Sequence, residues 1–542
     1  MERCGKKNFK LDKEIKLFSS ENRGLLLNKI KSQSFDITII GGGITGAGIC
    51  LDAVSRGLKV CLIEMNDFAS GTSSKSTKLI HGGLRYLEQF NFSLVRETGR
   101  ERAVLYSIAP HVVKPEKMLI PISKGGKLSS FLTSLALYVY DFLANVKKKD
   151  KKRSLSKESI YNIEPLLINE NIQGGVIYSE YRTDDSRLTI EILKKSYRIG
   201  AYPINYVKYI SSQNYQNNLS QLKCRDQISG KEFQINSKVI VNAAGAWVDN
   251  VVIGKKNKLL LSKGVHIVIP KNKLPLKQSV YFDAVDDRMI FAIPRRETVY
   301  IGTTDTLYDR SLDNIRVKKE EVVYLLNSVN KFFEPEIKID DIISSWVGLR
   351  PLIKENKKNI TEVSRKDEIF ISQDGIISIA GGKLTGYRKM AERVLKQVSK
   401  KINIPFSTSQ THKIKISTSS FEICFKKVSN NFNEKTSKKL FNRYGEDILK
   451  IHKIYIDLLK KHKVKLLVFS ELIYCIENEM CHNLTDFFTQ RNSMAYFEIQ
   501  KIQKEVELFK NLYIELKGKS RKVFLKEEKE LEEYLKKIST FI

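Results

Sequence analysis

The sequence predicts an α/β fold into which an α+β domain is inserted, followed by an all-α domain. Three observations support this expectation. A strand, a glycine-rich turn and a helix follow one another within residues 35–64. Strands, glycine turns and helices then alternate to about residue 405. Beyond that point glycine becomes rare and apolar residues recur at spacings of three and four, which is typical of helices.

These changes of pattern also predict the domain boundaries. For the polar N-terminal arm we expect disorder, as at many chain ends. The C-terminal helices are expected from runs such as Ile502, Val506, Phe509 and Tyr513. The expected ranges are 1–34 for the arm, 35–405 for a discontinuous nucleotide-binding domain, about 86–175 and 265–345 for the substrate domain interleaved with it, and 406–542 for the helical domain.

The segment FDITIIGGGITGAGICLDAVSRGLKVCLIE, residues 35–64, has the form of a Rossmann-like nucleotide-binding unit. In such a unit Gly41 allows a tight turn, Gly43 leaves space for a pyrophosphate, and Gly46 lets the helix approach the sheet. The helix N-terminus then offers N–H groups to the anion. Glu64 ends the second strand, where a carboxylate can accept hydrogen bonds from a ribose. Because strand, helix and acid all accompany the glycines, the segment predicts dinucleotide binding rather than an unrelated tight turn.

Composition narrows the class of protein. The chain has 542 residues, 42% of them apolar, so it can bury a large core in several domains. Its seven cysteines form no CxxC pair and no metal-ligand spacing, which predicts a reducing compartment and no metal site. The charge of +32 fits either an anionic membrane surface or a compositional drift toward lysine. No nucleic-acid-binding module accompanies it, so nucleic acid is not an expected partner.

Further glycine- and hydroxyl-rich segments follow apolar strands, at the sheet edge where open α/β folds bind ligands. They are GTSSKSTK at 71–78, VNAAGAWVD at 241–249, IGTTD at 301–305 and GGKLTGYR at 381–388. The residues expected to contact a cofactor are Gly41, Gly43, Gly46, Glu64, Thr72, Ser73, Lys78, Gly82, Gly245, Asp305, Gly382, Lys383, Leu384 and Thr385.

Taken in order, these motifs and HGGLRYLE, KGVHIVIP and WVGLRPL resemble the membrane-associated, quinone-linked FAD-dependent glycerol-3-phosphate dehydrogenases. The resemblance covers roughly residues 35–395, and the C-terminal part matches more loosely. It implies FAD as the cofactor and oxidation of sn-glycerol 3-phosphate to dihydroxyacetone phosphate. It also implies electron transfer to membrane quinone and peripheral attachment to the cytoplasmic face of the cell membrane.

The substrate is a small phosphate dianion, so its site should contain arginines, which bind phosphate oxygens at two points. Each candidate arginine can instead form a surface ion pair, and the pattern leaves that alternative open. The Tyr86 hydroxyl can donate to the same phosphate. The substrate-binding candidates are Arg85, Tyr86, Arg350, Arg365 and Arg388, matching basic residues that the resemblance places around the substrate.

The catalytic candidates are His266, Arg350 and Lys383. Oxidation of an alcohol by a flavin requires a base for the hydroxyl proton, and imidazole is suited to this near neutral pH. Strand alternation points His266 away from Val265 and Ile267, toward a cavity. The alternatives are a packed core histidine, or His81 as the base. Lys383 and the N–H groups after Gly382 are expected to stabilise negative charge on the reduced flavin.

The electron acceptor is the most open part of the prediction. No apolar run reaches the length of a membrane span, but FLTSLALYVYDFLANV at 131–146, followed by a basic run, predicts either an interfacial anchor or a buried helix. The C-terminal region is open as a dimer or membrane element, and a homodimer is one possible assembly. Alternative functions are an oxidase that produces hydrogen peroxide, a non-catalytic basic module that holds FAD, and an amino-acid oxidase.

Overall fold

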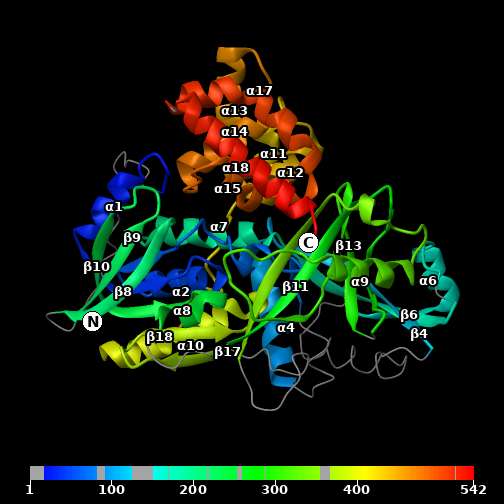
Figure 1. Cartoon of the computed structure of the whole chain (residues 1–542), viewed down its shortest axis with the longest axis horizontal. Helices are drawn as coiled ribbons and strands as arrows, with labels where there is room; N and C mark the ends of the chain where they lie inside the picture. Colours follow the sequence, from blue (N-terminus) through cyan, green and yellow to red (C-terminus); the bar gives the residue numbers. More distant parts are fainter. Residues whose placement is uncertain are drawn as a thin grey trace.

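The computed structural model describes residues 18–81, 92–124, 151–168, 170–215, 219–252, 259–286, 288–353, 367–518 and 520–542. Two sheets lie side by side, and the C-terminal helices, orange to red in Figure 1, stand against the second sheet and against α7 (Asp185–Arg198), which covers the first. Within the described residues, no helix is both long enough and apolar enough to cross a membrane.

The first sheet has eight strands and carries the glycine-rich motif. Its main path is β17-β18-β10-β1-β2-β7, with β8 and β9 extending from β10. Helix α2 packs against both α7 and α10, and together with the central strands they enclose an apolar core. The strands are β1 Ser34–Ile40, β2 Val60–Ile63, β7 Tyr202–Ile204, β8 Val207–Tyr215, β9 Leu219–Asp226, β10 Glu232–Asn242, β17 Asp367–Ile371 and β18 Ile377–Gly381.

The second sheet has ten strands in the order β15-β11-β14-β13-β12-β4-β6-β3, with β16 on β11 and β5 on β6. Val265 and Ile267 of β11 pack in a core with α9, whereas Val268 faces the C-terminal helices. The strands are β3 Leu79–Ile80, β4 Lys114–Ser123, β5 Arg153–Ser156, β6 Ile172–Arg182, β11 Leu259–Pro270, β12 Ser279–Asp283, β13 Met289–Arg295, β14 Thr298–Gly302, β15 Thr306–Tyr308 and β16 Ser344–Ile353. Strands β11 and β16 therefore extend past the expected limits at 265 and 345.

The C-terminal part is helical, and no strand occurs among its described residues. Ile502, Val506, Phe509 and Tyr513 are buried, as their spacing predicts. The α-helices of the chain are α1 Arg23–Lys31, α2 Ile44–Ser55, α4 Phe92–Ile108, α6 Lys157–Ile163, α7 Asp185–Arg198, α8 Val248–Val251, α9 Lys319–Asn330, α10 Tyr387–Ile402, α11 Phe421–Val428, α12 Glu434–Tyr444, α13 Ile448–His462, α14 Leu467–Asn478, α15 Leu484–Asp486, α16 Met494–Phe497, α17 Ile499–Lys517 and α18 Arg521–Ser539. A short π-helix, η7 Phe487–Arg491, follows α15.

Two expectations about peripheral segments have different outcomes. The expectation of disorder is wrong for the second half of the N-terminal arm, because α1 buries Leu26 and Ile30 and Arg23 forms a 2.8 Å ion pair with Asp226. Two turns of helix with apolar residues three to four apart are enough to dock this arm on the sheet. The expected anchor segment at 131–146 lies outside the described residues.

Candidate active site

A cavity of about 1730 Å³ lies at the carboxyl ends of β1, β2, β10 and β18, where the two sheets and the C-terminal helices meet. It is larger than the usual pocket for a drug-sized ligand, at about 300–1,000 Å³. Its walls include Ile40, Glu64, Ala243 and Gly381 from these strand ends. This is the edge at which open α/β sheets bind ligands.

The glycine turn after β1 leaves the N-terminus of α2 open to this cavity. Gly43 caps α2 and has no side chain, so the cap residue itself accepts no side-chain hydrogen bond from the first turn of the helix. A Cβ at Gly43 would lie 2.9 Å from Ser73 Oγ, and one at Gly46 would lie 1.9 Å from the Gly41 carbonyl oxygen. The Ile44 N–H donates to Ser73 Oγ at 2.9 Å. The turn therefore brings backbone N–H groups and the hydroxyl loop to one place, as phosphate binding requires.

Glu64 lies at the end of β2, and its carboxylate bridges two loops. Oε2 accepts from the Gly42 N–H at 2.7 Å, and Oε1 accepts from the Asn66 N–H at 2.9 Å. Burial raises the pKa of Glu64 above its usual value, against the effect of these donors. The side chain lines the cavity beside the glycine turn, where the sequence predicts contact with a ribose.

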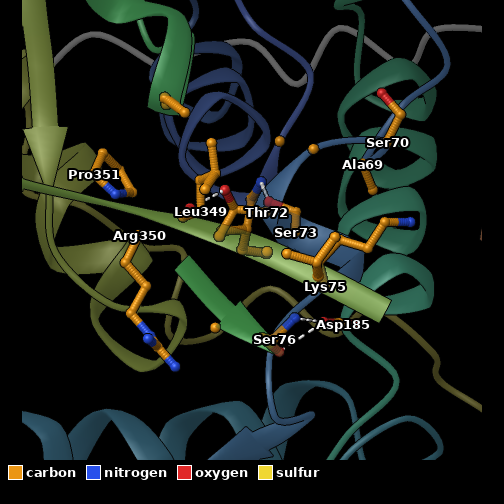
Figure 2. Close-up of a pocket in the computed structure, with 18 of the residues that line it drawn as sticks. Ala69, Ser70, Thr72, Ser73, Lys75, Ser76, Asp185, Leu349, Arg350 and Pro351 are labelled. Carbon is orange, nitrogen blue, oxygen red and sulfur yellow. Dashed lines mark hydrogen bonds between the residues drawn. The ribbon is translucent and has the colours of Figure 1, made fainter. Parts of the chain in front are cut away.

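The hydroxyl loop after β2 is fixed against β16. Thr72 Oγ1 donates to the Leu349 carbonyl at 2.7 Å, and Figure 2 shows Thr72 and Ser73 beside this strand, with Arg350 pointing away from them. The Trp346 Nε1–H donates to the Ser76 carbonyl at 3.1 Å. These bonds join the nucleotide-binding sheet to the second sheet across the cavity.

Arg350 of β16 lies within the cavity, and polar groups hold its guanidinium. Nη1 donates to Asp305 Oδ1 at 3.2 Å, and Nη2 donates to Thr303 Oγ1 at 3.0 Å. Space for the guanidinium depends on Gly264, since a Cβ there would lie 2.6 Å from Arg350 Nη2. Asp305 also accepts a hydrogen bond from Ser262. The cavity thus contains an oriented guanidinium on the second sheet.

His266 of β11 also lines the cavity, on the strand face opposite Val265 and Ile267. Its ring stacks on Trp346 with centroids 4.8 Å apart, and Nε2 lies 3.0 Å from Thr77 Oγ1. Nδ1 is buried and has no hydrogen-bond partner among the described residues. Burial, together with the charges of Arg350 and Lys78, lowers the pKa of His266 well below the ordinary imidazole value. The imidazole is therefore neutral at pH 7.

The turn after β18 forms another wall. Gly381 and Gly382 both have a φ of +78°, which favours glycine because it has no Cβ. Thr385 Oγ1 donates to the His81 carbonyl at 3.2 Å, which joins this turn to the second sheet. Lining residues here include the expected Gly382, Lys383, Leu384 and Thr385, with Gly245 on the neighbouring turn.

Two expected site residues have structural contacts instead. The Arg388 guanidinium lies outside the cavity and forms a buried ion pair with Glu101, with Nε and Nη2 donating at 3.0 and 3.1 Å. Lys78 does not line the cavity, because its Nζ lies 2.6 Å from buried Asp185. In each case a buried carboxylate from a distant segment neutralises the cation, and no local motif reveals that partner. The expected roles of Arg388 and Lys78 stay predictions that these contacts do not support. Gly82, Arg85, Tyr86 and Arg365 lie outside the described residues.

The sequence did not indicate that the C-terminal domain contributes to the cavity wall. Asp486 and Gln490 line the cavity, and neighbouring Arg491 pairs with Asp67 at 2.5 Å on the loop after β2. Asp486 accepts from the Tyr206 hydroxyl at 2.6 Å. No local motif around these residues resembles a binding loop, so only the tertiary structure reveals them. Within the described residues, no cluster of His, Cys, Asp or Glu has the arrangement of a metal site.

The open helix N-terminus, the ribose-side acid and the glycine turns together define a flavin- or nicotinamide-dependent oxidoreductase fold. A family model described as FAD dependent oxidoreductase matches residues 36–388, and one described as the C-terminal domain of alpha-glycerophosphate oxidase matches residues 377–519. The chain belongs to the FAD-dependent oxidoreductase family, in its glycerol-3-phosphate dehydrogenase branch.

Relatives support that branch along most of the chain. The aerobic glycerol-3-phosphate dehydrogenase of Bacillus subtilis is 43% identical over 511 residues, which cover 90% of this chain and 92% of the relative. That of Staphylococcus haemolyticus is 42% identical, with 92% and 93% covered. The crystal structure of the glycerol-3-phosphate dehydrogenase from Bacillus halodurans, complexed with FAD, has a TM-score of 0.82 at 36% identity and covers 96% of this chain and 99% of its own.

FAD is the cofactor of this chain, and the cavity fits it. The open N-terminus of α2 and the space at Gly43 suit the pyrophosphate, and Glu64 suits the ribose of the adenosine. The expectations of FAD, of the mixed α/β fold and of the C-terminal helical domain are confirmed. The individual roles of the site residues stay predictions.

Proposed function

We propose that this protein oxidises sn-glycerol 3-phosphate to dihydroxyacetone phosphate and passes the electrons to membrane quinone. The observation that carries the proposal is the presence of Arg350 in the same cavity as the dinucleotide turn. A guanidinium binds a phosphate through two parallel hydrogen bonds, and Asp305 and Thr303 fix its orientation. The relatives named above carry glycerol-3-phosphate in their names, which supports the same substrate.

In this proposal FAD, when bound, accepts the hydride from C2 of the substrate. Arg350 binds the phosphate and sets the orientation of the carbon chain. His266 accepts the proton of the C2 hydroxyl, and Thr77 fixes its ring through the contact to Nε2. Because the imidazole is neutral at pH 7, it is in the correct protonation state without an activating partner. Lys383 adds positive charge at the glycine turn after β18.

Quinone as acceptor, attachment to the inner face of the cell membrane, and a homodimer belong to the same proposal. The high positive charge supports attachment to an anionic bilayer, and so does the apolar segment 131–146 with its basic run. The specific competing function is an oxidase, because the C-terminal family model is described from an alpha-glycerophosphate oxidase.

One experiment tests both parts. The purified yellow holoenzyme is mixed anaerobically with glycerol 3-phosphate, and loss of flavin absorbance is followed. Bleaching is expected with glycerol 3-phosphate and not with glycine, which separates the proposal from an amino-acid oxidase or a binding module. The reduced enzyme is then divided between a soluble quinone analogue and oxygenated buffer. Much faster reoxidation by oxygen, with hydrogen peroxide formed, would assign the oxidase function instead.

A further inference from the structure

Three cations line the cavity where it meets the C-terminal domain, and no carboxylate among the described residues pairs with them. They are Lys75 of the hydroxyl loop, Arg316 of the segment before α9, and Lys537 near the end of α18. We call them the rim cations. All three are half-buried, and they come from the nucleotide-binding domain, the substrate domain and the C-terminal domain respectively.

Carboxylates that line the same cavity make their contacts elsewhere, so they leave the rim cations uncompensated. Glu64, Asp313 and Asp486 accept hydrogen bonds from the Gly42 N–H, the Ser311 hydroxyl and the Tyr206 hydroxyl respectively. Five others are each paired with a different basic residue. The pairs are Asp67 with Arg491, Asp185 with Lys78, Glu180 with Arg102, Asp286 with Arg288 and Asp305 with Arg350.

Neutral groups hold two of the rim cations, Lys75 and Arg316, in place. Lys75 Nζ contacts the hydroxyls of Tyr496 and Tyr534 at 2.5 and 3.2 Å. Arg316 Nη2 donates to Thr540 Oγ1 at 3.1 Å, while its Nε is buried with no partner among the described residues. Burial, with the like charges of Arg316 and Lys75, lowers the pKa of Lys537. Like charges gathered without a counterion favour the binding of an anion.

Hydrogen bonds to backbone carbonyls fix the elements that carry these side chains. The Ser345 hydroxyl donates to the Ile538 carbonyl at 2.8 Å, which ties the end of α18 to β16. The Ile542 N–H donates to the Val317 carbonyl at 3.1 Å, which holds the segment of Arg316 against the C-terminal residues. The rim is therefore organised before any ligand arrives.

The rim is continuous with the proposed phosphate site. A Cβ at Gly348 would lie 2.7 Å from the Lys75 carbonyl oxygen, so β16 and the hydroxyl loop are in direct contact there. Arg350 follows two residues later on the same face of β16, and Figure 2 shows Lys75 and Arg350 on these adjacent segments. The two side chains leave these segments in different directions in Figure 2, so an anion bound at the rim would pass along β16 to reach the Arg350 guanidinium.

We propose that the rim cations form a second anion subsite, which captures the phosphate dianion of the substrate before Arg350 binds it. The inference rests on the function proposed above and adds a step of capture to it. It predicts that the rim affects how fast the substrate arrives and leaves the rate at saturation unchanged.

The test uses the holoenzyme and two charge reversals of equal size. Lys537→Glu changes the rim, whereas Lys536→Glu changes the preceding residue of α18, which is exposed and does not line the cavity. Anaerobic stopped-flow reduction gives the second-order rate constant at low substrate and the limiting rate at saturation. Lys537→Glu should lower the second-order constant about tenfold at low ionic strength and flatten its salt dependence. Its FAD content and limiting rate should match those of Lys536→Glu.

Inorganic phosphate is the probe for the subsite itself. Titration calorimetry on the oxidised holoenzyme should show weaker phosphate binding in Lys537→Glu and in the milder Lys537→Gln than in Lys536→Glu. Equal second-order constants for the two charge reversals would overturn the proposal. A loss of FAD in Lys537→Gln would also overturn it, since the rim would then hold the cofactor. If the unaltered enzyme is not reduced by glycerol 3-phosphate, the proposed function fails, and phosphate titration still decides whether the subsite exists.

Discussion

Arg350 and Arg388 are the same residue type on two motifs of the same fold, and burial separates their roles. Arg350 is 22% exposed and reaches the cavity, where Asp305 orients it. The Arg388 side chain is 4% exposed and is neutralised by Glu101, which lies 287 residues earlier in the chain. A phosphate requires a guanidinium in an accessible place, and Arg350 meets that condition.

Arg350→Ala should raise KM for glycerol 3-phosphate about 10- to 100-fold, because a hydrogen bond to a charged group contributes roughly 1.5–3 kcal/mol. The weak reaction with unphosphorylated glycerol should change little. Steady-state kinetics on both substrates make the comparison. Arg388→Ala is the control and should lower the thermal stability while leaving KM close to its original value. Equal losses on both substrates in Arg350→Ala would indicate structural damage rather than lost phosphate binding.

Gly43→Val should abolish retention of FAD. A Cβ at this position already lies 2.9 Å from Ser73 Oγ, so the larger side chain fills the space that suits the pyrophosphate. The measurement is the ratio of flavin to protein absorbance after purification. Gly24→Val is a suitable control, because nothing lies within 4 Å of a Cβ there and its φ is not positive. A full complement of FAD in Gly43→Val would contradict the assignment of this turn.

His266→Ala should slow anaerobic flavin reduction about 10²–10⁴-fold, the usual contribution of a general base, with little change in substrate affinity. The sequence alone suggests a pH dependence near neutrality. The structure shifts the expected pH dependence to lower pH, because a histidine with a lowered pKa becomes protonated only well below pH 6.5. The acid limb of the reduction rate should therefore lie below pH 6.5 and disappear in the variant. A decrease smaller than about tenfold would make His266 a packing residue and His81 the next candidate.

At the scale of elements, the sequence predicted the two glycine-rich turns that lie at the cavity, because each turn is encoded by a short local motif. The turn at Gly41, Gly43 and Gly46 and the turn after β18 both lie at the cavity, because strand, glycine and helix occur within a few residues of one another. Contacts between distant segments were not predictable in this way. The pairs Lys78–Asp185 and Arg491–Asp67 join segments 107 and 424 residues apart, and neither side has a pattern that specifies its partner.

A buried ion network docks α7 on the C-terminal domain. Arg187 donates to Glu479 at 2.7 and 3.0 Å, and Lys194 contacts both Glu479 and Asp447. In Figure 1, α7 runs directly beneath the C-terminal helices. Removing one partner of a buried pair leaves the opposite charge buried without a counterion. That is far more destabilising than losing an exposed pair.

Glu479→Gln should therefore lower the unfolding free energy by about 3–5 kcal/mol. Glu434→Gln, which removes an exposed pair with Lys438, should cost less than about 1 kcal/mol. Burial raises the pKa of Glu479, but the charges of Arg187 and Lys194 outweigh it and hold this pKa below the usual value. The native state thus releases this proton more readily than the unfolded chain.

The sign of the pH dependence follows from that lowered pKa. The contribution of Glu479 is fully present above the unfolded value of about 4.3 and is lost as pH falls below it. Denaturant midpoints measured between pH 5 and pH 3 should show a smaller decline in Glu479→Gln than in the unaltered protein. A decline of the same size in both would mean that this carboxylate does not contribute to acid sensitivity.

For the whole molecule, the cavity depends on all three domains at once. The nucleotide turn, Arg350 and Asp486 come from the first sheet, the second sheet and the C-terminal helices, and none of them alone encloses the site. The sequence predicted the first two contributions from motifs. It did not predict the third, because the helices that supply it have ordinary amphipathic patterns whose packing partner is specified only by the complete fold.

The charge of +32 is a property of the whole chain, and it leads to the last prediction. The holoenzyme should co-sediment with vesicles that contain anionic lipid and much less with neutral vesicles, since each basic residue near an anionic surface contributes roughly 1 kcal/mol. Binding through charge alone should disappear at about 0.5 M salt, where the Debye length is only a few ångströms. Any binding that persists there would come from apolar insertion, for which segment 131–146 is the expected element.

Replacing the six basic residues of 147–153 by glutamine should weaken binding more than replacing six exposed lysines elsewhere, at Lys460, Lys461, Lys522, Lys526, Lys529 and Lys536. Equal effects of the two sets would show that the net charge acts without a localised attachment site, and equal binding to both kinds of vesicle would contradict electrostatic attachment altogether.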